Sequence, residues 1–278
     1  MRKLLLIVPL LVVGLFANTG IAQEAKRAIT KITGDVYRFQ NNFHFSVFTI
    51  TGNGVVVTDP INAEAAAWLK AEIGKLTEQP ITHLVYSHSH GDHASGGAAF
   101  GDVPNVVAHA NAPAAIDGVA PTMRFSDQMT FTQGGKQFAL TYLGPGHGVD
   151  LIAMVIRPEN VGFVVDAASA KRLPYRDFPG SNVDDWTNQV RKIETLDFEI
   201  FAGGHGAMGI KADATTARVY MEELRAKVLA GLKAGKSVDD LVQSVTMAEY
   251  RDWASYEQWR GLNVQGMARF LKESGAAQ

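Results

Sequence analysis

The stretch HSHGDH at residues 88–93 places three of the chain's eight histidines and one aspartate within six positions. It directly follows the mostly apolar run Ile81–Tyr86, which indicates a buried strand. Neutral imidazole and carboxylate groups are the ligands that zinc, manganese and iron(II) favour. The stretch therefore predicts a metal site at the end of a strand, and the remaining ligands have to come from other parts of the chain.

Three later residues supply candidate ligands, each directly after a predicted strand. His147 lies in the tight loop GPGHG at residues 144–148, and Asp166 follows the run GFVV. His205 lies in GGHG at residues 203–206. Neighbouring glycines let the backbone approach such a site closely. With the donors of HSHGDH, these residues are too many for one tetrahedral ion and suit two ions that share a carboxylate.

The periodicity of apolar residues predicts alternating strands and helices. Strands are expected at residues 35–39, 45–51, 54–58, 81–86, 103–108, 136–143, 151–157, 161–165 and 198–202. Helices are expected from the N-cap Asn62 to residue 78, over a short stretch opened by Pro113, from the N-cap Asn182 to residue 196, over residues 212–234, from a capping box at Ser237, and over residues 248–273. This order predicts an α/β fold in one large domain, with ligand sites at the carboxyl ends of strands.

The order HxHxDH, then a histidine, an aspartate and a final histidine resembles the metallo-β-lactamase superfamily of metallohydrolases. The resemblance covers most of residues 30–210, and the run VTDP at residues 57–60 is similar to the family's strand-end aspartate. It implies a four-layer αββα sandwich with metals at one edge. Here residues 23–278 would form one hydrolase domain, on which a helical C-terminal extension, residues 212–278, packs.

The resemblance also implies two metal sites that share Asp166. The first site would use His88, His90 and His147, and the second would use Asp92, His93 and His205. Zinc is the expected metal for both sites, with iron or manganese as alternatives. The implied reaction is hydrolysis of an ester, lactone, thioester or amide by a metal-bridging hydroxide. Asp92 is in addition a candidate catalytic residue that orients the hydroxide and passes a proton to the leaving group.

Other activities stay open on the same residues. An aspartate at position 166 is more similar to glyoxalase II, lactonases and phosphodiesterases than to β-lactamases, but β-lactam hydrolysis remains an alternative because the pocket could admit a cyclic amide. A mononuclear iron enzyme similar to persulfide dioxygenases would use His88, His147 and Asp166 alone. A non-catalytic metal-binding module would bind metal without turnover.

Several cations and aromatic residues near these ligands give clues to the substrate. Lys171, Arg172, Tyr175 and Arg176 closely follow Asp166 and could bind an anionic group, since arginine holds carboxylates bidentately. A solvated loop explains the same residues equally well.

The remaining histidines and the aromatic residues of the helical extension have simpler explanations. We expect His83 and His109 to be structural. His44 is expected to be a loop or core residue rather than a ligand, with a place in the pocket lining as the alternative. The aromatics of the extension, Tyr250, Trp253, Tyr256 and Trp259, are expected to pack it onto the domain rather than to cap the site.

The N-terminus predicts a secretory signal peptide over residues 1–22. Arg2 and Lys3 precede the apolar run Leu4–Ala17, and small residues stand before Gln23. As a helix this run would span roughly 21 Å, which is too short for a hydrocarbon core of about 30 Å. We therefore expect cleavage, a periplasmic or secreted location and no membrane anchor on the mature protein.

Charge and cysteine content exclude several classes of protein. The formal net charge of the 278-residue chain is −2, which lacks the basic excess of nucleic-acid-binding proteins. The chain has no cysteine, which excludes disulfides, thiolate ligands and a cysteine nucleophile. The expected partner is a small-molecule substrate, while the sequence specifies no oligomeric state.

Overall fold

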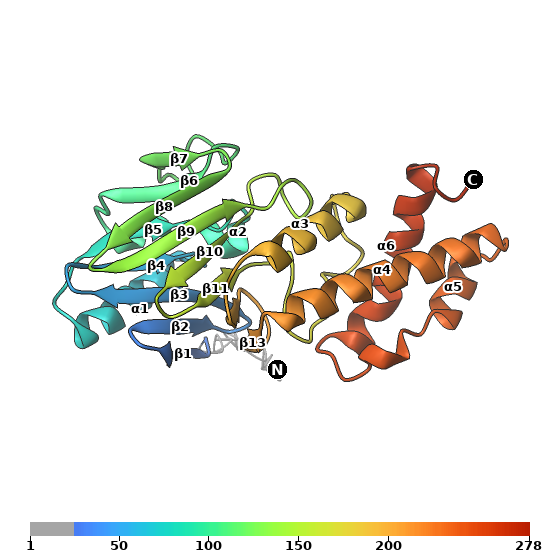
Figure 1. Cartoon of the computed structure of the whole chain (residues 1–278), viewed down its shortest axis with the longest axis horizontal. Helices are drawn as coiled ribbons and strands as arrows, with labels where there is room; N and C mark the ends of the chain where they lie inside the picture. Colours follow the sequence, from blue (N-terminus) through green and yellow to red (C-terminus); the bar gives the residue numbers. More distant parts are fainter. Residues whose placement is uncertain (1–24) are drawn as a thin grey trace, which may run out of the picture.

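Within residues 25–278, which the computed structural model describes, two β-sheets lie face to face and helices cover their outer faces (Figure 1). The layers follow the order helix, sheet, sheet, helix, and this confirms the expected αββα sandwich. The predicted signal peptide at residues 1–22 lies outside the described residues.

The strands of the first sheet follow the order of the chain, and one of them leads to HSHGDH. They are β1 (Arg27–Thr33), β2 (Val36–Asn41), β3 (His44–Thr51), β4 (Gly54–Thr58), β5 (Ile81–Val85), β6 (Asn105–His109) and β7 (Met123–Phe125). Pairing is antiparallel from β1 to β4 and parallel from β4 to β7. Parallel neighbours need a crossover, and α1 (Ala63–Leu76) supplies it between β4 and β5. Asn62 caps α1 as predicted, because its Oδ1 accepts a hydrogen bond from Ala65 N at 2.9 Å.

The second sheet carries the later candidate ligands. Its strands are β8 (Gln128–Gln133), β9 (Lys136–Tyr142), β10 (Ile152–Arg157), β11 (Val161–Val164), β12 (Ile200–Gly203) and β13 (Gly209–Ile210). Hydrogen bonding links them in the order β13-β12-β11-β10-β9-β8. Strands β11 and β12 are parallel, and α3 (Val183–Thr195) connects them with Asn182 as its N-cap.

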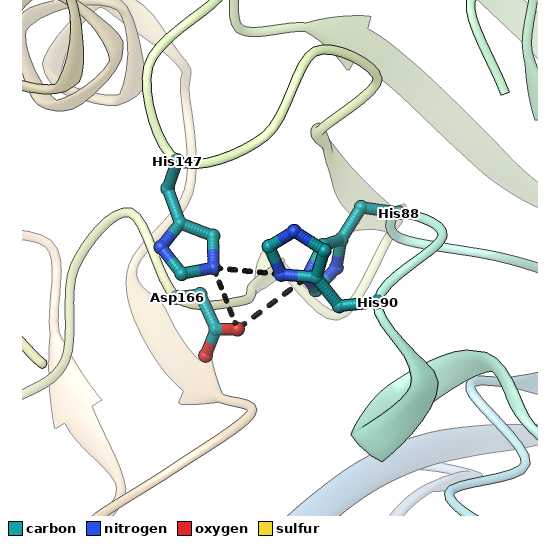
Figure 2. Close-up of side chains that lie close together, drawn as sticks. All are labelled: His88, His90, His147 and Asp166. Atoms are coloured by element: carbon teal, nitrogen blue, oxygen red, sulfur yellow. Dashed lines mark hydrogen bonds and ion pairs between the residues drawn. The ribbon is translucent and has the colours of Figure 1, made fainter. Parts of the chain in front are cut away.

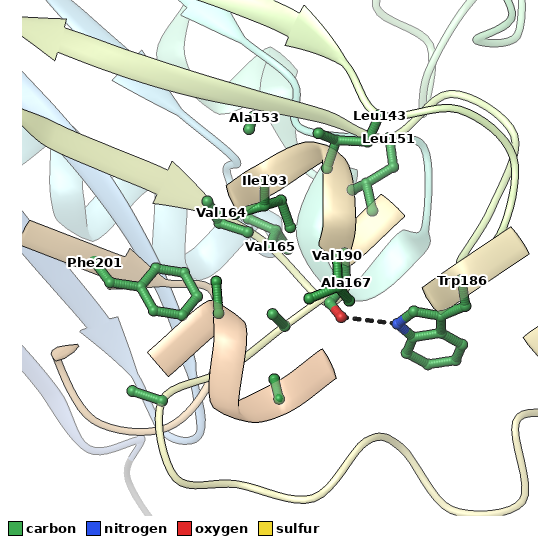
Figure 3. Close-up of a cluster of buried hydrophobic side chains, with 14 of the residues drawn as sticks. Leu143, Leu151, Ala153, Val164, Val165, Ala167, Trp186, Val190, Ile193 and Phe201 are labelled. Carbon is green, nitrogen blue, oxygen red and sulfur yellow. Dashed lines mark hydrogen bonds between the residues drawn. The ribbon is translucent and has the colours of Figure 1, made fainter. Parts of the chain in front are cut away.

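Alternation of side chains along the strands separates two cores. In β4, Val55 and Val57 face α1 and pack with its Leu69 and Ile73, while Val56 points to the other sheet. Between the sheets and under α3 lies the larger core (Figure 3). Both faces of each sheet are therefore covered, and polar ligand residues are left to the sheet edge.

Helices α4 (Ala212–Lys233), α5 (Val238–Ser244) and α6 (Tyr256–Glu273) form the C-terminal extension beside the sandwich (Figure 1). The predicted capping box at Ser237 is present, with Asp240 as its partner. Tyr220 and Met221 of α4 belong to the same buried core as Met267 of α6. No helix within the described part of the chain is long and apolar enough to cross a membrane.

Short elements depart from the sequence predictions. Helix α2 (Gly91–Ala94) and the 3₁₀ turns Gly97–Phe100 and Ala248–Tyr250 were not separately predicted, nor were β1, β7, β8 and β13. The helix expected at Pro113 is wrong. Asp117 and Gly118 have φ values of 43° and 80°, so the chain turns there and Ile116 pairs with Val119.

Candidate metal centre

The HSHGDH stretch bends where β5 ends and continues into the single helical turn α2. His88 and His90 lie in the irregular segment, and Asp92 and His93 lie in the turn that begins at Gly91. A regular strand would point alternate residues to opposite faces. The irregular segment instead lets neighbouring side chains serve two adjacent groups of ligands.

The first group consists of His88, His90, His147 and Asp166, whose ligand atoms all lie within 4.8 Å of one another (Figure 2). His147 Nε2 is 3.2 Å from His90 Nδ1 and 3.2 Å from Asp166 Oδ2. His88 Nε2 is 3.4 Å from the same carboxylate oxygen. Three imidazole nitrogens thus converge on one side of Asp166.

The second group consists of Asp92, His93, His205 and again Asp166. His93 Nε2 and His205 Nε2 are 3.1 Å apart. Asp166 Oδ1 lies 3.2 Å from His205 Nε2, while Asp166 Oδ2 lies 3.4 Å from His93 Nε2. The carboxylate of Asp166 therefore stands between the two groups, in the place of a bridging ligand.

The tautomers assigned from hydrogen bonds fit metal ions at both groups. His205 Nδ1 donates to Phe43 O at 2.9 Å, which leaves the Nε2 lone pair for the cluster. The hydroxyl of Ser87 donates to Asp59 Oδ2 at 2.6 Å, so His88 Nδ1 donates to Ser87 Oγ. The opposite atom, His88 Nε2, is buried without a hydrogen-bond partner among residues 25–278. Buried lone pairs that face one another in this way suit a shared cation.

The charges of the cluster keep its acids ionised. Burial alone would raise the pKa of Asp166, but the surrounding histidines, His93 above all, hold that pKa well below its usual range. Burial, aided by the charges of His88 and His147, lowers the pKa of His90 to about 4. A deprotonated carboxylate and a neutral imidazole are the forms that bind metal.

Helix α3 fixes the loop that carries His147. Gln189 Oε1 accepts a hydrogen bond from His147 N at 2.8 Å, and Gln189 Nε2 donates to Gly144 O at 2.7 Å. Gly146 has φ +151°, and a Cβ there would lie 2.6 Å from Gln189 Oε1. The Trp186 ring meets His147 edge to face at 4.6 Å. Only a glycine-containing loop can approach α3 this closely.

Arg38 of β2 fixes the loop that carries His205. Its guanidinium donates to Gly203 O at 3.1 Å and to Gly206 O at 2.8 Å, and it lies over the Phe45 ring at 3.6 Å. A Cβ on Gly204 would be 3.0 Å from His93 Cε1, so this loop also depends on a missing side chain. The sequence analysis did not identify three residues that hold the ligands in place. They are Arg38, Gln189 and Ser87, whose hydroxyl donates a hydrogen bond to Asp59.

A family comparison identifies the class of protein to which this geometry belongs. The family model described as "Metallo-beta-lactamase superfamily" matches residues 42–205, more than half of the chain. The chain belongs to the metallo-β-lactamase superfamily.

Two curated proteins are distant relatives of the chain. The chain is 24% identical over 232 residues to 2,4-dinitroanisole O-demethylase subunit alpha of Nocardioides sp. (strain JS1661), covering 80% of this chain and 70% of that protein. It is 27% identical over 158 residues to metallo-beta-lactamase IND-1 of Chryseobacterium indologenes, covering 54% of this chain and 65% of that protein.

Solved structures of other proteins share the fold. A metallo-beta-lactamase from Pontibacter korlensis superposes with a TM-score of 0.63 at 18% identity, over 71% of this chain and 99% of its own. A double mutant of the sec-alkyl sulfatase PisA1 gives a TM-score of 0.72 at 16% identity, over 90% of this chain and 50% of its own. Coverage of 90% has to include much of the C-terminal extension, so the extension resembles part of the sulfatase, whereas the lactamase superposes on a smaller share of this chain.

A cavity of about 670 Å³ opens onto the two groups of candidate ligands. His90, Asp92, His147, Asp166 and His205 are among the residues that line it. The helical extension contributes to the lining through Met221 of α4 and Trp259 of α6, among others.

Two of the four residues predicted to contact the substrate line the cavity, and two do not. Arg172 and Tyr175 line the cavity, whereas Lys171 and Arg176 are exposed residues outside the described lining. Trp259 lines the cavity too, which corrects the expectation that every aromatic of the extension only packs. Tyr250, Trp253 and Tyr256 are buried and do pack, as expected.

His44 belongs to neither ligand group within the described residues, as expected, and the structure places it in the cavity lining, the alternative considered for it. His44 lines the cavity, and its Nε2 lies 3.3 Å from Asp92 Oδ2. The reason is a contact across the fold, because Phe45 N donates to Gly204 O at 2.8 Å and folds the β2–β3 hairpin over the cluster. His83 stacks on Phe131 and His109 hydrogen-bonds to Ser126 O, so these two are structural as expected.

Proposed function

We propose that this chain is an exported hydrolase that uses two divalent metal ions, zinc by preference, to cleave ester, lactone, thioester or amide bonds. The observation that carries the proposal is the pair of ligand groups around Asp166 in the wall of a substrate-sized cavity. His88, His90 and His147 would hold one ion, Asp92, His93 and His205 the other, and Asp166 both. The signal peptide proposed at residues 1–22 would deliver the enzyme to the periplasm or the outside of the cell.

Metal ions at such sites lower the pKa of bound water to near 7 and polarise carbonyl or phosphoryl oxygens. The chain's own residues would prepare the site for this chemistry. Ser87 and Phe43 fix the histidine tautomers, and His44 orients the Asp92 carboxylate through a 3.3 Å contact. Asp92 is half exposed to the cavity, where its carboxylate could take a proton and pass it to a leaving group.

The proposal is tested with a substrate panel on the mature, metal-loaded protein. The panel contains p-nitrophenyl esters, aliphatic lactones, a thioester and a β-lactam, each assayed before chelation, after chelation and after zinc is returned. We expect the protein to hydrolyse at least one of the esters, the lactones or the thioester. This activity should be lost on chelation and should return when zinc is added. Turnover of none of them by fully loaded protein would contradict the hydrolase proposal and support a non-catalytic metal-binding module.

The first ligand group also supports a second candidate function. His88, His147 and Asp166 present two histidines and one carboxylate around one point, a set that non-haem iron(II) oxygenases use. An oxygen electrode with thiol and persulfide substrates tests this candidate. Oxygen uptake by iron-loaded protein, without hydrolysis by zinc-loaded protein, would favour it over the hydrolase.

A further inference from the structure

Arg172 is held between the metal-ligand loop and the helical extension. On one side, Ala170 pairs with Ala207, next to the His205 loop. On the other side, Leu173 N donates to Ala254 O at 3.1 Å, and Ala254 N donates to Lys171 O at 2.9 Å. The backbone at position 172 is therefore fixed from both sides, so its side chain is directed by the fold rather than left to a free loop.

Within the part of the chain that the structure describes, the guanidinium of Arg172 has a stacking partner but no hydrogen-bond acceptor. It lies 4.6 Å from the centre of the Trp259 ring and lines the cavity. Among residues 25–278, no hydrogen bond or ion pair of its guanidinium is found, although other arginines such as Arg225 and Arg269 are paired with carboxylates. Burial lowers the pKa of Arg172, while the charge of Asp166 partly raises it. A partly buried cation with unused donors is costly unless a ligand supplies the acceptor.

Away from the two ligand groups, the residues that line the cavity are mainly apolar. Leu173, Pro174 and Tyr175 line it from the segment after Arg172, and Met221 and Trp259 line it from the extension. Such a surface suits a hydrocarbon or aromatic body and offers few groups to hydrogen-bond a polar one. Of the lining residues between positions 25 and 278, Arg172 is the cationic one apart from the histidines.

We infer that the cavity selects substrates with an apolar body and one carboxylate, and that the Arg172 guanidinium, backed by Trp259, binds this carboxylate away from the bond that is cleaved. The inference rests on the proposed hydrolase and names its substrate class. Arginine binds carboxylates through two parallel hydrogen bonds, and such charge-assisted bonds are about twice as strong as neutral ones. The stacked ring limits the rotation of the guanidinium, so less freedom is lost when the substrate binds.

A pair of esters with acyl chains of equal length measures the effect of the carboxylate alone. Mono-p-nitrophenyl adipate carries a free carboxylate at the far end, and p-nitrophenyl hexanoate ends in a methyl group. We expect the wild type to have a kcat/KM at least tenfold higher for the adipate ester. Arg172→Gln should raise KM for the adipate ester about tenfold or more and change KM for the hexanoate ester less than twofold.

Two further variants control for charge and geometry. Arg172→Lys keeps the charge without the bidentate fork, so its KM for the adipate ester should lie between those of wild type and Arg172→Gln. Arg251→Gln removes the same charge from an exposed arginine of the extension outside the cavity lining, and it should leave both esters unaffected. Equal effects of Arg172→Gln on the two esters, or no effect on either, would overturn the inference.

A binding experiment separates this inference from the hydrolase proposal. Calorimetry would compare 4-phenylbutane-1-sulfonate, which is a poor metal ligand, with 4-phenylbutan-1-ol on the metal-loaded protein. We expect the sulfonate to bind at least tenfold tighter to the wild type and no tighter than the alcohol to Arg172→Gln. This preference without hydrolysis of any ester would support the anion site and contradict the hydrolase; equal binding by the wild type would overturn the anion site while leaving the hydrolase to its own panel.

Discussion

Asp166 is the residue through which the two ligand groups meet. Its backbone φ is +56°, a left-handed value that aspartate tolerates better than most side chains. The resulting turn directly after β11 points the carboxylate at His88, His93, His147 and His205. A strained position of this kind persists where the surrounding structure holds it in place, as it does at many functional sites.

Asp92 gives the most specific prediction at the residue scale. Asp92→Asn keeps one oxygen for a metal but cannot accept a proton, so we expect kcat to fall about 100-fold or more while metal content falls less than twofold. Elemental analysis and steady-state kinetics on the same sample measure both quantities. Asp102→Asn removes an equal charge from an exposed residue and is the control. Parallel losses of metal and turnover would show that Asp92 is only a ligand.

At the scale of elements, the order of strands and the ligands themselves could be predicted from the sequence, because each ligand follows an apolar run. Contacts between distant elements could not. His44 lies in the site only because the β2–β3 hairpin pairs with the His205 loop across 162 positions of the chain. The half-buried strand β8, which alternates polar with apolar residues before Gly134-Gly135, did carry a period-two signal that could have identified it.

Gln189 also had a sequence pattern from which its supporting role could have been predicted, in this case in a helix. It is buried on the face of α3 that also carries Trp186, Val190 and Ile193, so it is a polar residue within an apolar stripe. Such a residue needs partners, and the structure supplies them in the His147 loop.

The element-scale prediction follows from these two hydrogen bonds. Gln189→Ala leaves His147 N and Gly144 O without partners, which should cost about 1–3 kcal/mol and loosen the loop. We expect weaker metal binding, measured by competition with a chelator of known affinity. Asn188→Ala, on the exposed side of the same helix, should retain wild-type affinity. Unchanged affinity in Gln189→Ala would mean that the loop holds His147 without α3.

At the scale of the whole molecule, the cluster joins the two sheets. The ligands of HSHGDH follow β5 of the first sheet, and Asp166 and His205 follow β11 and β12 of the second. A bound ion would therefore add a further link between the two sheets, beside the hydrogen bonds from Arg38 and Phe45 to the His205 loop.

Chelation should accordingly lower the melting temperature of the protein. An ion present at about 1,000 times its Kd adds about 4 kcal/mol to the free energy of unfolding, which corresponds to a shift on the order of 10 °C for a domain of this size. Differential scanning calorimetry with and without chelator measures the shift, and added zinc should reverse it. Identical melting temperatures would contradict a linking role for the metal.

The helical extension makes a second whole-molecule prediction. Asn263 of α6 donates to Pro174 O at 3.1 Å and accepts from Tyr220 Oη at 2.7 Å, so it ties α4 and α6 to the cavity wall. Asn263→Ala should lower the melting temperature by several degrees. The substitution leaves Pro174 O and the Tyr220 hydroxyl without their partner, which should cost about 1–3 kcal/mol of the free energy of unfolding. Gln265→Ala, exposed on the same helix, is the control. A melting temperature equal to that of the control would show that the extension is held by apolar packing alone.

The measurement that tests the central claim most directly is the metal content of the mature protein, purified without added metal and analysed by elemental mass spectrometry. The two ligand groups that share Asp166 predict about two zinc ions per chain. One iron ion per chain would contradict the dinuclear account and favour oxygen chemistry at the first group. No bound metal, even after incubation with zinc, would contradict a metal centre altogether.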